Sequence, residues 1–276
     1  MYHLIRDEND FKVLTIILLL IVIFFMDFIL SDLLSSWINN NLVRNIFYQF
    51  IRIFITLGTL WAFLYFTLSK PISYYYVRNF SSKIVKWALF GIILPIFIIL
   101  TYLAMDRITF LGFTQFSNQI LSLKIIYSLI LAFSASITEE FLFRGFIYRL
   151  IEDQWNYKYS IILPSIFFGL AHVQYLDLPN ILLTGASGTL AGTLFALILH
   201  KTKSIWNSIG THFAWNLMLV GPLIKISEDT ALLEEAIIPL KIEASNILLT
   251  GSEFGLESSI ITITILSISN IMVLKW

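Results

Sequence analysis

The sequence predicts an all-α fold, a polytopic membrane bundle of about eight transmembrane helices. Of its 276 residues, 58% are hydrophobic and only 13% are charged, whereas soluble domains average about 25% charged residues. A soluble protein of this length has too little interior to hide so much apolar surface from water. Long apolar stretches recur along the chain, and in lipid they must be helical, because backbone groups left unpaired in hydrocarbon cost too much free energy.

Eight stretches approach the roughly 20 apolar residues that cross a bilayer core. The predicted spans are Phe11–Leu33, Asn45–Leu68, Ile84–Met105, Leu121–Ile151, Tyr159–Val173, Ile181–His200, Ile205–Ile224 and Ser258–Leu274. The fourth is interrupted by charges and the fifth is short. We interpret the first as an uncleaved span and not a signal peptide, because Asp7 and Glu8 precede it and no small-residue cleavage site follows.

The distribution of lysine and arginine predicts the orientation. Segment 70–86 carries four basic residues and no acid, whereas segment 225–257 carries seven acids and two lysines. We therefore expect a multi-pass cell-membrane protein with both termini cytoplasmic, and an amphipathic helix on the outer surface within segment 225–257. The composition, rich in Ile, Phe and Asn, is typical of AT-rich genomes and indicates a bacterial source.

Charge and cysteine content exclude several kinds of protein. The 18 basic and 18 acidic residues balance, so nothing indicates a nucleic-acid partner. The absence of cysteine excludes disulfides, thiolate nucleophiles and cysteine-ligated metals. The lipid bilayer is the one partner that composition predicts, and the oligomeric state stays undetermined.

Three charged residues, Glu139, Glu140 and Arg144, lie inside the predicted fourth span. Each charge costs about 2.5 to 3.5 kcal/mol in hydrocarbon on insertion scales. Glu140 and Arg144 are four residues apart on one helix face and can form an ion pair. Glu139 points about 100° away and has no partner within the helix, which makes it a candidate general base. Alternatively, the span ends at Ile137 and Glu139 begins an amphipathic helix at the membrane surface.

Two histidines, His172 and His212, lie within or beside apolar stretches, and Asn216 follows His212 by one helical turn. A single histidine in such a place is more often a hydrogen-bonded packing residue. Three stretches that bring polar groups to a similar depth are better explained by one shared site.

These residues form an ordered set of motifs. EEFLFR begins at Glu139, FGLAH ends at His172, and HFAWN runs from His212 to Asn216. Together they resemble the CAAX protease and bacteriocin-processing family of intramembrane proteases, which has the patterns Glu-Glu-x-x-x-Arg, Phe-x-x-x-His and His-x-x-x-Asn. The resemblance covers roughly Ser134 to Leu219, and each motif is specific only as part of the set.

The resemblance implies a role for each matched residue. Glu139, with His172, activates a water molecule; Glu140 and Arg144 orient the site; His212 and Asn216 stabilise the oxyanion. It leaves metal use open, since a zinc ion would take Glu139, His172 and His212 as ligands. The helical His-Glu-x-x-His signature of zinc proteases is absent, which favours chemistry without a cofactor.

We accordingly divide the chain into helices without a recognised motif (1–118), a catalytic helix core (119–224), and an acidic loop with the last helix (225–276). The expected function is an intramembrane endopeptidase acting on a membrane-associated peptide or protein, by CAAX-type cleavage, bacteriocin processing or cleavage of a membrane protein.

Three alternatives stay open. Gly185–Gly188 (Gly-Ala-Ser-Gly) resembles the nucleophile motif of rhomboid serine proteases, although such a run is more often a close-packing surface between helices. Buried Glu and His also serve as proton relays in transporters. A non-proteolytic protein that binds a partner would keep the same residues for stability.

Overall fold

The computed structural model describes residues 10–77, 80, 82–243 and 246–276. Asp7, Glu8 and part of segment 70–86 lie outside the described residues. The described chain is mostly helical, and its longer helices are α1 (Asp10–Ser35), α2 (Asn41–Leu68), α3 (Ile84–Ala104), α4 (Asn118–Glu140), α6 (Tyr157–Ala171), α7 (Leu178–Thr202), α8 (Ile205–Leu219) and α11 (Ile260–Lys275).

Helix starts coincide with polar residues that cap free backbone N–H groups. The side chain of Asn40 accepts from the Val43 amide at 3.0 Å before α2, and that of Asp177 accepts from the Asn180 amide at 3.0 Å before α7. Asn156 caps α6 in the same way. These caps let the helices begin directly after short connections.

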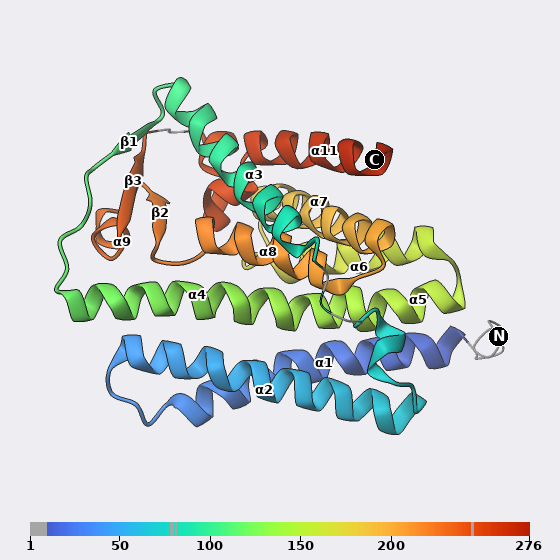
Figure 1. The fold of residues 1–276 in the computed structure, drawn as a ribbon. Coiled ribbons are helices and arrows are strands. Elements are labelled where there is room, and N and C mark those ends of the chain that lie inside the picture. The colour runs from blue at the N-terminus through green and yellow to red at the C-terminus, as the bar shows by residue number, and fades with distance from the viewer. Residues whose placement is uncertain (1–9, 78–79, 81, 244–245) are drawn as a thin grey trace.

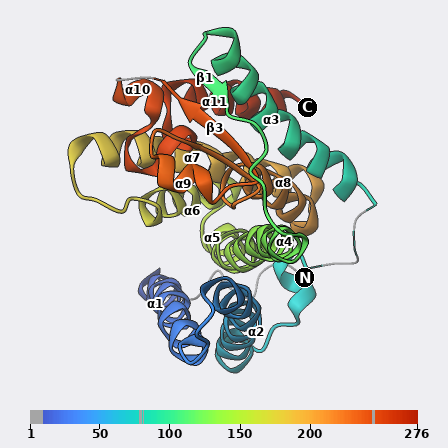
Figure 2. The ribbon, with the colours of Figure 1, turned by 90° about the vertical axis from the view of Figure 1, so that its left-hand side faces the viewer.

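The helices form two unequal layers on either side of α4. The hairpin of α1 and α2 packs along one side of α4, whereas α3, α6, α7, α8 and α11 lie on the other side (Figures 1 and 2). Helix α4 therefore contacts both groups and is covered from both sides. Any polar side chain in its middle must find its partners among these neighbours.

Helix α4 does not end at the predicted charges. It continues through a π-helical segment, η2 (Phe141–Ile147), into α5 (Tyr148–Gln154), so that one helix of 37 residues results. All seven residues of η2 are buried. The helix therefore does not end at Ile137, and the part that follows Glu140 is covered by protein. π-Helical turns are rare and occur frequently at functional sites.

Helices α6 and α7 approach each other at small residues. A Cβ atom added to Gly188 would lie 2.8 Å from the Cα of Gly169, which is closer than packing allows. The interpretation of the Gly185–Gly188 run as a close-packing surface is confirmed. The short distance between the two backbones brings His172, at the end of α6, close to α7.

Segment 225–257 forms a small sheet where we had expected an amphipathic helix, and that expectation is wrong. Strand β3 (Ile238–Ile242) pairs antiparallel with β1 (Ile108–Phe110) and parallel with β2 (Ile224–Ser227), in the order β1-β3-β2. The short helices α9 (Thr230–Glu234), α10 (Ile247–Thr250) and η3 (Ser252–Ser258) complete the segment. Pro239 disfavours a helix here, and β1 supplies a pairing partner distant in sequence.

The all-α membrane fold is confirmed, but the count of eight spans is not. Within the described residues, five helices are long and apolar enough to cross a membrane, or six if η3 and α11, which meet at 42°, form one broken span. Helices α6 and α8 have 15 residues each, so each is only about 22 Å long. Helix α8 is largely buried and carries His212 and Asn216, whereas α6 has one exposed face and is followed directly by His172.

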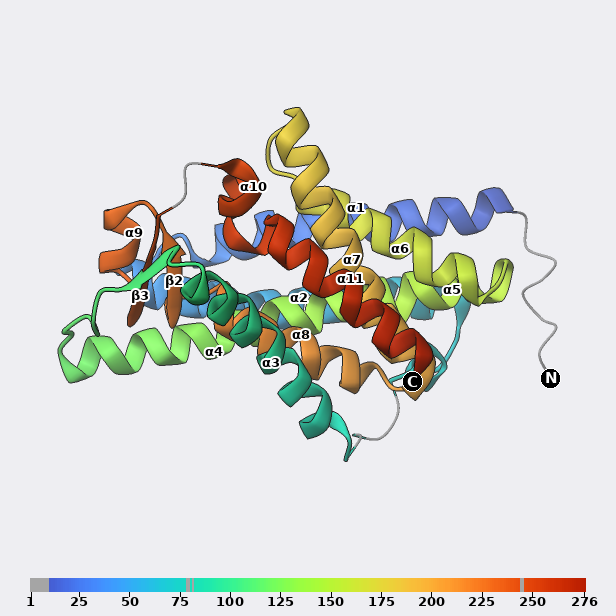
Figure 3. The same cartoon turned by 90° about the horizontal axis from the view of Figure 1, so that it is seen from above.

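The start of α1 and the end of α11 lie on the same side of the bundle. Seen from above, the start of α1 and the end of α11 lie towards α5, whereas the sheet lies at the opposite end (Figure 3). This arrangement agrees with termini on one side. That this side is the cytoplasmic one stays a prediction.

Candidate active site

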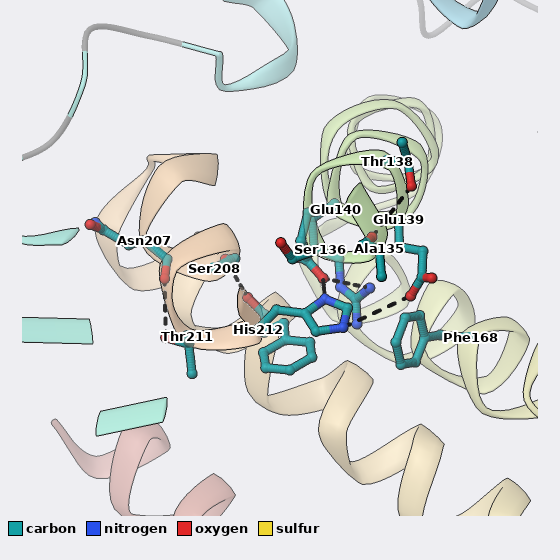
Figure 4. A network of polar contacts seen from close by, with 12 residues as sticks. Ala135, Ser136, Thr138, Glu139, Glu140, Phe168, Asn207, Ser208, Thr211 and His212 are labelled. Atoms are coloured by element: carbon teal, nitrogen blue, oxygen red, sulfur yellow. Dashed lines mark hydrogen bonds and ion pairs between the residues drawn. The ribbon is translucent and has the colours of Figure 1, made fainter. Parts of the chain in front are cut away.

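Glu140 is the centre of a buried charged cluster. Its Oε1 atom lies 3.1 Å from Nη1 of Arg144 and 3.0 Å from Nδ1 of His212, and both Glu140 and Arg144 are fully buried. Figure 4 shows the carboxylate of Glu140 joined by a dashed line to the imidazole of His212. The ion pair expected from the spacing on the helix is therefore present. The bond to His212, which comes from α8, was not expected.

The guanidinium of Arg144 is enclosed by aromatic rings. Its Cζ atom lies 4.3 Å from the ring centre of Phe168 and 5.3 Å from that of Phe195, so cation–π attraction replaces part of the lost hydration. A Cβ atom on Gly192 would come within 3.1 Å of Nη2. The absence of a side chain at this glycine of α7 thus leaves room for the arginine.

Glu139 faces the two histidines. Its Oε2 atom lies 4.0 Å from Nε2 of His172 and 3.9 Å from Nε2 of His212. The side chain keeps 14% of its surface exposed, whereas that of Glu140 keeps none. One oxygen of Glu139 therefore lies between two imidazole nitrogens, at distances that leave room for a small molecule to bridge them.

The hydrogen bond made by Nδ1 defines the tautomer of each of the two histidines. Nδ1 of His172 lies 2.7 Å from the backbone carbonyl of Phe168, which can only accept a hydrogen bond. Nδ1 of His212 likewise donates to the carboxylate of Glu140. With the proton on Nδ1, the neutral ring presents the lone pair of Nε2 towards Glu139. Both histidines are thus held as acceptors on the same side.

Two further residues at the site were not among those predicted from the sequence. Nη2 of Arg52, from α2, lies 3.5 Å from Oε1 of Glu139, and its guanidinium lies 4.0 Å from the ring centre of Phe28. Glu257, from η3, accepts a hydrogen bond from Nε1 of Trp215 at 2.7 Å. Glu139 is therefore not left without a partner. An arginine in an apolar stretch was the only signal that pointed to Arg52.

A cavity of about 750 Å³ contains the candidate residues. Glu139, His172, His212 and Asn216 all line it, and its wall follows the second half of α8 to β2 and η3. Glu140 and Arg144 are not among its lining residues and lie behind it. The six residues selected from the sequence thus separate into four at the cavity and two that support them.

The spacing does not fit zinc bound by Glu139, His172 and His212. Two ligand atoms of a tetrahedral zinc, each about 2.0 to 2.1 Å from the metal, lie about 3.3 Å apart, and here the oxygen and the nitrogens are 3.9 and 4.0 Å apart. Among the described residues, no group of three His, Cys, Asp or Glu side chains is arranged to hold a metal ion. Arg52 also places a cation beside the same carboxylate.

The serine of the Gly-Ala-Ser-Gly run is occupied within its own helix. Oγ of Ser187 donates to the backbone carbonyl of Thr184 at 3.2 Å. The ring of His212 is bound to Glu140 and directed at Glu139, and no contact in the described part of the chain joins it to Ser187. The rhomboid-like alternative therefore receives no support from the geometry.

Comparisons with known proteins agree with the motifs. Residues 121–218 match the family described as type II CAAX prenyl endopeptidase, Rce1-like, so the resemblance found in the sequence is confirmed over that segment. The chain is 32% identical over 84 residues to the protein named "Putative membrane peptidase YdiL" of Bacillus subtilis (strain 168). That alignment covers 30% of this chain and 32% of the relative. No solved structure matches the chain.

Proposed function

Because residues 121–218 match the type II CAAX prenyl endopeptidase family, we propose that this membrane protein is an intramembrane endopeptidase that uses a water molecule activated by Glu139. The single observation that carries the proposal is the approach of Oε2 of Glu139 to Nε2 of both His172 and His212 within one cavity. The catalytic core would comprise residues 119–224.

In the first step, a water molecule would lie between Oε2 of Glu139 and Nε2 of His172. A general base must be within hydrogen-bond reach of the proton that it takes, and a gap of 4.0 Å between the two groups admits one water in contact with both. Glu139 accepts a proton as the water oxygen attacks the carbonyl carbon of the substrate. The Nδ1–H bond of His172 to Phe168 keeps the ring in place during this step.

In the second step, the tetrahedral intermediate carries a negative oxygen, which needs hydrogen-bond donors. The amide of Asn216 is a donor in every protonation state of the site, whereas His212 donates through Nε2 only when both ring nitrogens carry protons. The intermediate collapses as the C–N bond breaks and the protonated Glu139 returns its proton to the leaving amine. Water is consumed, and a carboxylate and an amine are formed.

Glu140 and Arg144 act through His212. Because Glu140 binds Nδ1 of His212 at 3.0 Å and is itself held by Arg144, the two residues orient the imidazole and do not touch the substrate. A carboxylate that binds the far ring nitrogen of a histidine fixes its tautomer and ring orientation. We assign them as positioning residues.

Arg52 would position Glu139, and its removal is expected to lower kcat. The Arg52→Gln change releases Oε1 of Glu139, and a displacement of about 1 Å costs up to about 100-fold in rate; we expect a loss of 10-fold to 100-fold in kcat with little change in KM. Arg52→Lys keeps the charge and should restore part of the rate. The matched control is Arg44→Gln, also in α2, whose pair with Asp32 is exposed and contributes little.

A merely structural role for Arg52 predicts another result. In that case, activity per folded molecule would stay normal while the melting temperature falls. Steady-state kinetics on the folded fraction, with thermal unfolding measured on the same samples, distinguish the two roles.

The proposed activity is tested on three synthetic peptides. One is a farnesylated peptide that ends in a CAAX sequence, one is a bacteriocin-type leader peptide, and one is a single transmembrane segment. Purified protein in lipid nanodiscs should cleave at least one of them, and mass spectrometry in H₂¹⁸O should find one ¹⁸O atom at the new carboxylate. If all three peptides stay intact with folded protein after prolonged incubation, cleavage of these classes is contradicted.

We also expect activity to resist removal of zinc. Since the spacing of Glu139, His172 and His212 does not fit tetrahedral coordination, dialysis against a strong chelator should leave the rate unchanged. Elemental analysis should find well under one zinc per chain. Loss of activity on chelation, with recovery on addition of zinc, would assign the chemistry to a bound metal acting as a Lewis acid.

A further inference from the structure

The small sheet has an edge strand inside the candidate active-site cavity. The order β1-β3-β2 gives β2 only one neighbour. Residues 225–229, which include most of this strand, line the same cavity as Glu139 and His172. An edge strand presents unpaired backbone groups and is a template for another extended chain.

The register shows which backbone groups of β2 are free. The amide of Ile238 donates to the carbonyl of Leu223 at 3.0 Å, and Ile224 and Ile226 lie opposite Ile238 and Leu240. In a parallel pair, alternate residues direct both their N–H and C=O groups to the partner strand. The odd-numbered residues of β2 therefore face β3, and Ile224 and Ile226 direct their backbone groups away from it.

Ile226 is the better placed of these two. Ile224 is buried, whereas Ile226 is half-buried and lines the cavity. The register turns its backbone N–H and C=O away from β3, and outside the strand pairing no backbone hydrogen bond of Ile226 is found among the described residues. A polar backbone group at a cavity wall without a protein partner is available to a ligand.

We propose that the free edge of β2 binds the backbone of the peptide substrate as an added strand, with the N–H and C=O of Ile226 as its hydrogen-bonding groups. The inference rests on the proposed function and names the substrate's conformation, an extended peptide. A protease can attack a peptide bond only where the backbone is not in a helix. In a bilayer, the backbone groups freed by unwinding must find new partners. The edge supplies them in the cavity that Glu139 also lines, in the manner of strand addition.

Binding by strand addition depends on the backbone of the substrate more than on its side chains. The cavity is lined by His212 and Asn216 of α8 as well as by β2, so a strand added to β2 would lie in the same cavity as the carboxylate of Glu139. The expected substrates are peptides of varied sequence that share an extendable, proline-free segment at the cleavage point, because proline cannot donate a backbone hydrogen bond.

Amide hydrogen exchange tests binding without requiring cleavage. The Glu139→Gln protein is incubated with each of the three synthetic peptides of the activity test, and exchange is read at single residues. We expect exchange at the Ile226 amide to slow at least tenfold with one of the peptides, while exchange at Lys225, whose amide faces β3, stays unchanged. Slowing that needs no peptide and grows with protein concentration would assign the edge to a second copy of the chain and overturn the proposal.

Kinetics give a second test on the active protein. Ile226→Pro removes the N–H at the edge and spares the groups that face β3, so KM should rise about 3-fold to 10-fold, the usual contribution of one hydrogen bond, with kcat little changed. Ile226→Val keeps the N–H group, so its KM should rise less than that of Ile226→Pro. Thermal unfolding checks that the proline variant folds.

The outcomes separate this proposal from the proposed function. Protection of Ile226 without cleavage of any peptide supports strand addition and overturns the protease. Cleavage without protection of Ile226 overturns strand addition and leaves the protease in place. If no peptide is cleaved and none slows hydrogen exchange at the Ile226 amide, both proposals are overturned.

Discussion

Replacement of Glu139 by glutamine is expected to lower the rate of peptide hydrolysis by about 100-fold to 10,000-fold, the contribution of a positioned general base. Glutamine has nearly the same shape and keeps an oxygen beside Arg52, but it cannot take the proton of water. Insertion and purification should therefore be normal. Turnover in nanodiscs, measured by mass spectrometry of the products, is the readout.

Ser187→Ala is the matched comparison for this experiment. Ser187 also lines the cavity, but its hydroxyl donates to the carbonyl of Thr184, so its removal should leave turnover unchanged. We also expect that serine-directed fluorophosphonates do not inhibit the protein. A loss of less than about tenfold for Glu139→Gln would show that Glu139 is not the base. An inactive but folded Ser187→Ala protein would favour a serine mechanism.

Replacement of Arg144 by leucine is expected to destabilise the protein by about 3 to 5 kcal/mol, the usual cost of removing one partner of a buried ion pair. Glu140 would keep only His212 as a partner, in a position with no exposure to solvent. Folded yield and melting temperature should both fall. Activity should fall as well, since Glu140 would no longer hold the imidazole in place.

The double change Glu140→Gln with Arg144→Leu separates stability from activity. Removing both charges takes away the unpaired carboxylate, so most of the lost stability should return, while the rate should stay low because His212 lacks its carboxylate. A thermal-unfolding cycle of the two single variants and the double variant measures the coupling. Additive effects in that cycle would contradict the ion pair.

Composition and local spacing determined much of this protein. The excess of apolar residues predicted a helical membrane bundle, because only helices satisfy their backbone within one segment in lipid. The separation of Glu140 and Arg144 by one helical turn predicted their ion pair, since such neighbours meet whatever surrounds the helix. The three motifs indicated the family over the segment that the comparison then matched.

Contacts between distant segments were not predictable in this way. His212 was expected to work with Asn216 on its own helix, yet its Nδ1 atom binds Glu140 on α4. Arg52 lies in a helix without any motif and reaches Glu139 only because α2 packs along α4. Such pairs depend on how whole helices are arranged, and periodicity within one helix carries no information about its neighbour.

The sheet is the clearest case of a feature that tertiary structure decided. The acids and apolar residues of segment 225–257 are compatible with an amphipathic helix, and strand β3 exists because β1 and β2 lie beside it. The lengths of the helices were decided in the same way, since α6 and α8 have only 15 residues each although their sequences are apolar. Sequence by itself determined the class of protein, the ion pair within one helix and the motif residues; the tertiary structure decided the partners of Glu139 and His212 and the strand at the cavity, because those contacts join segments far apart in the chain.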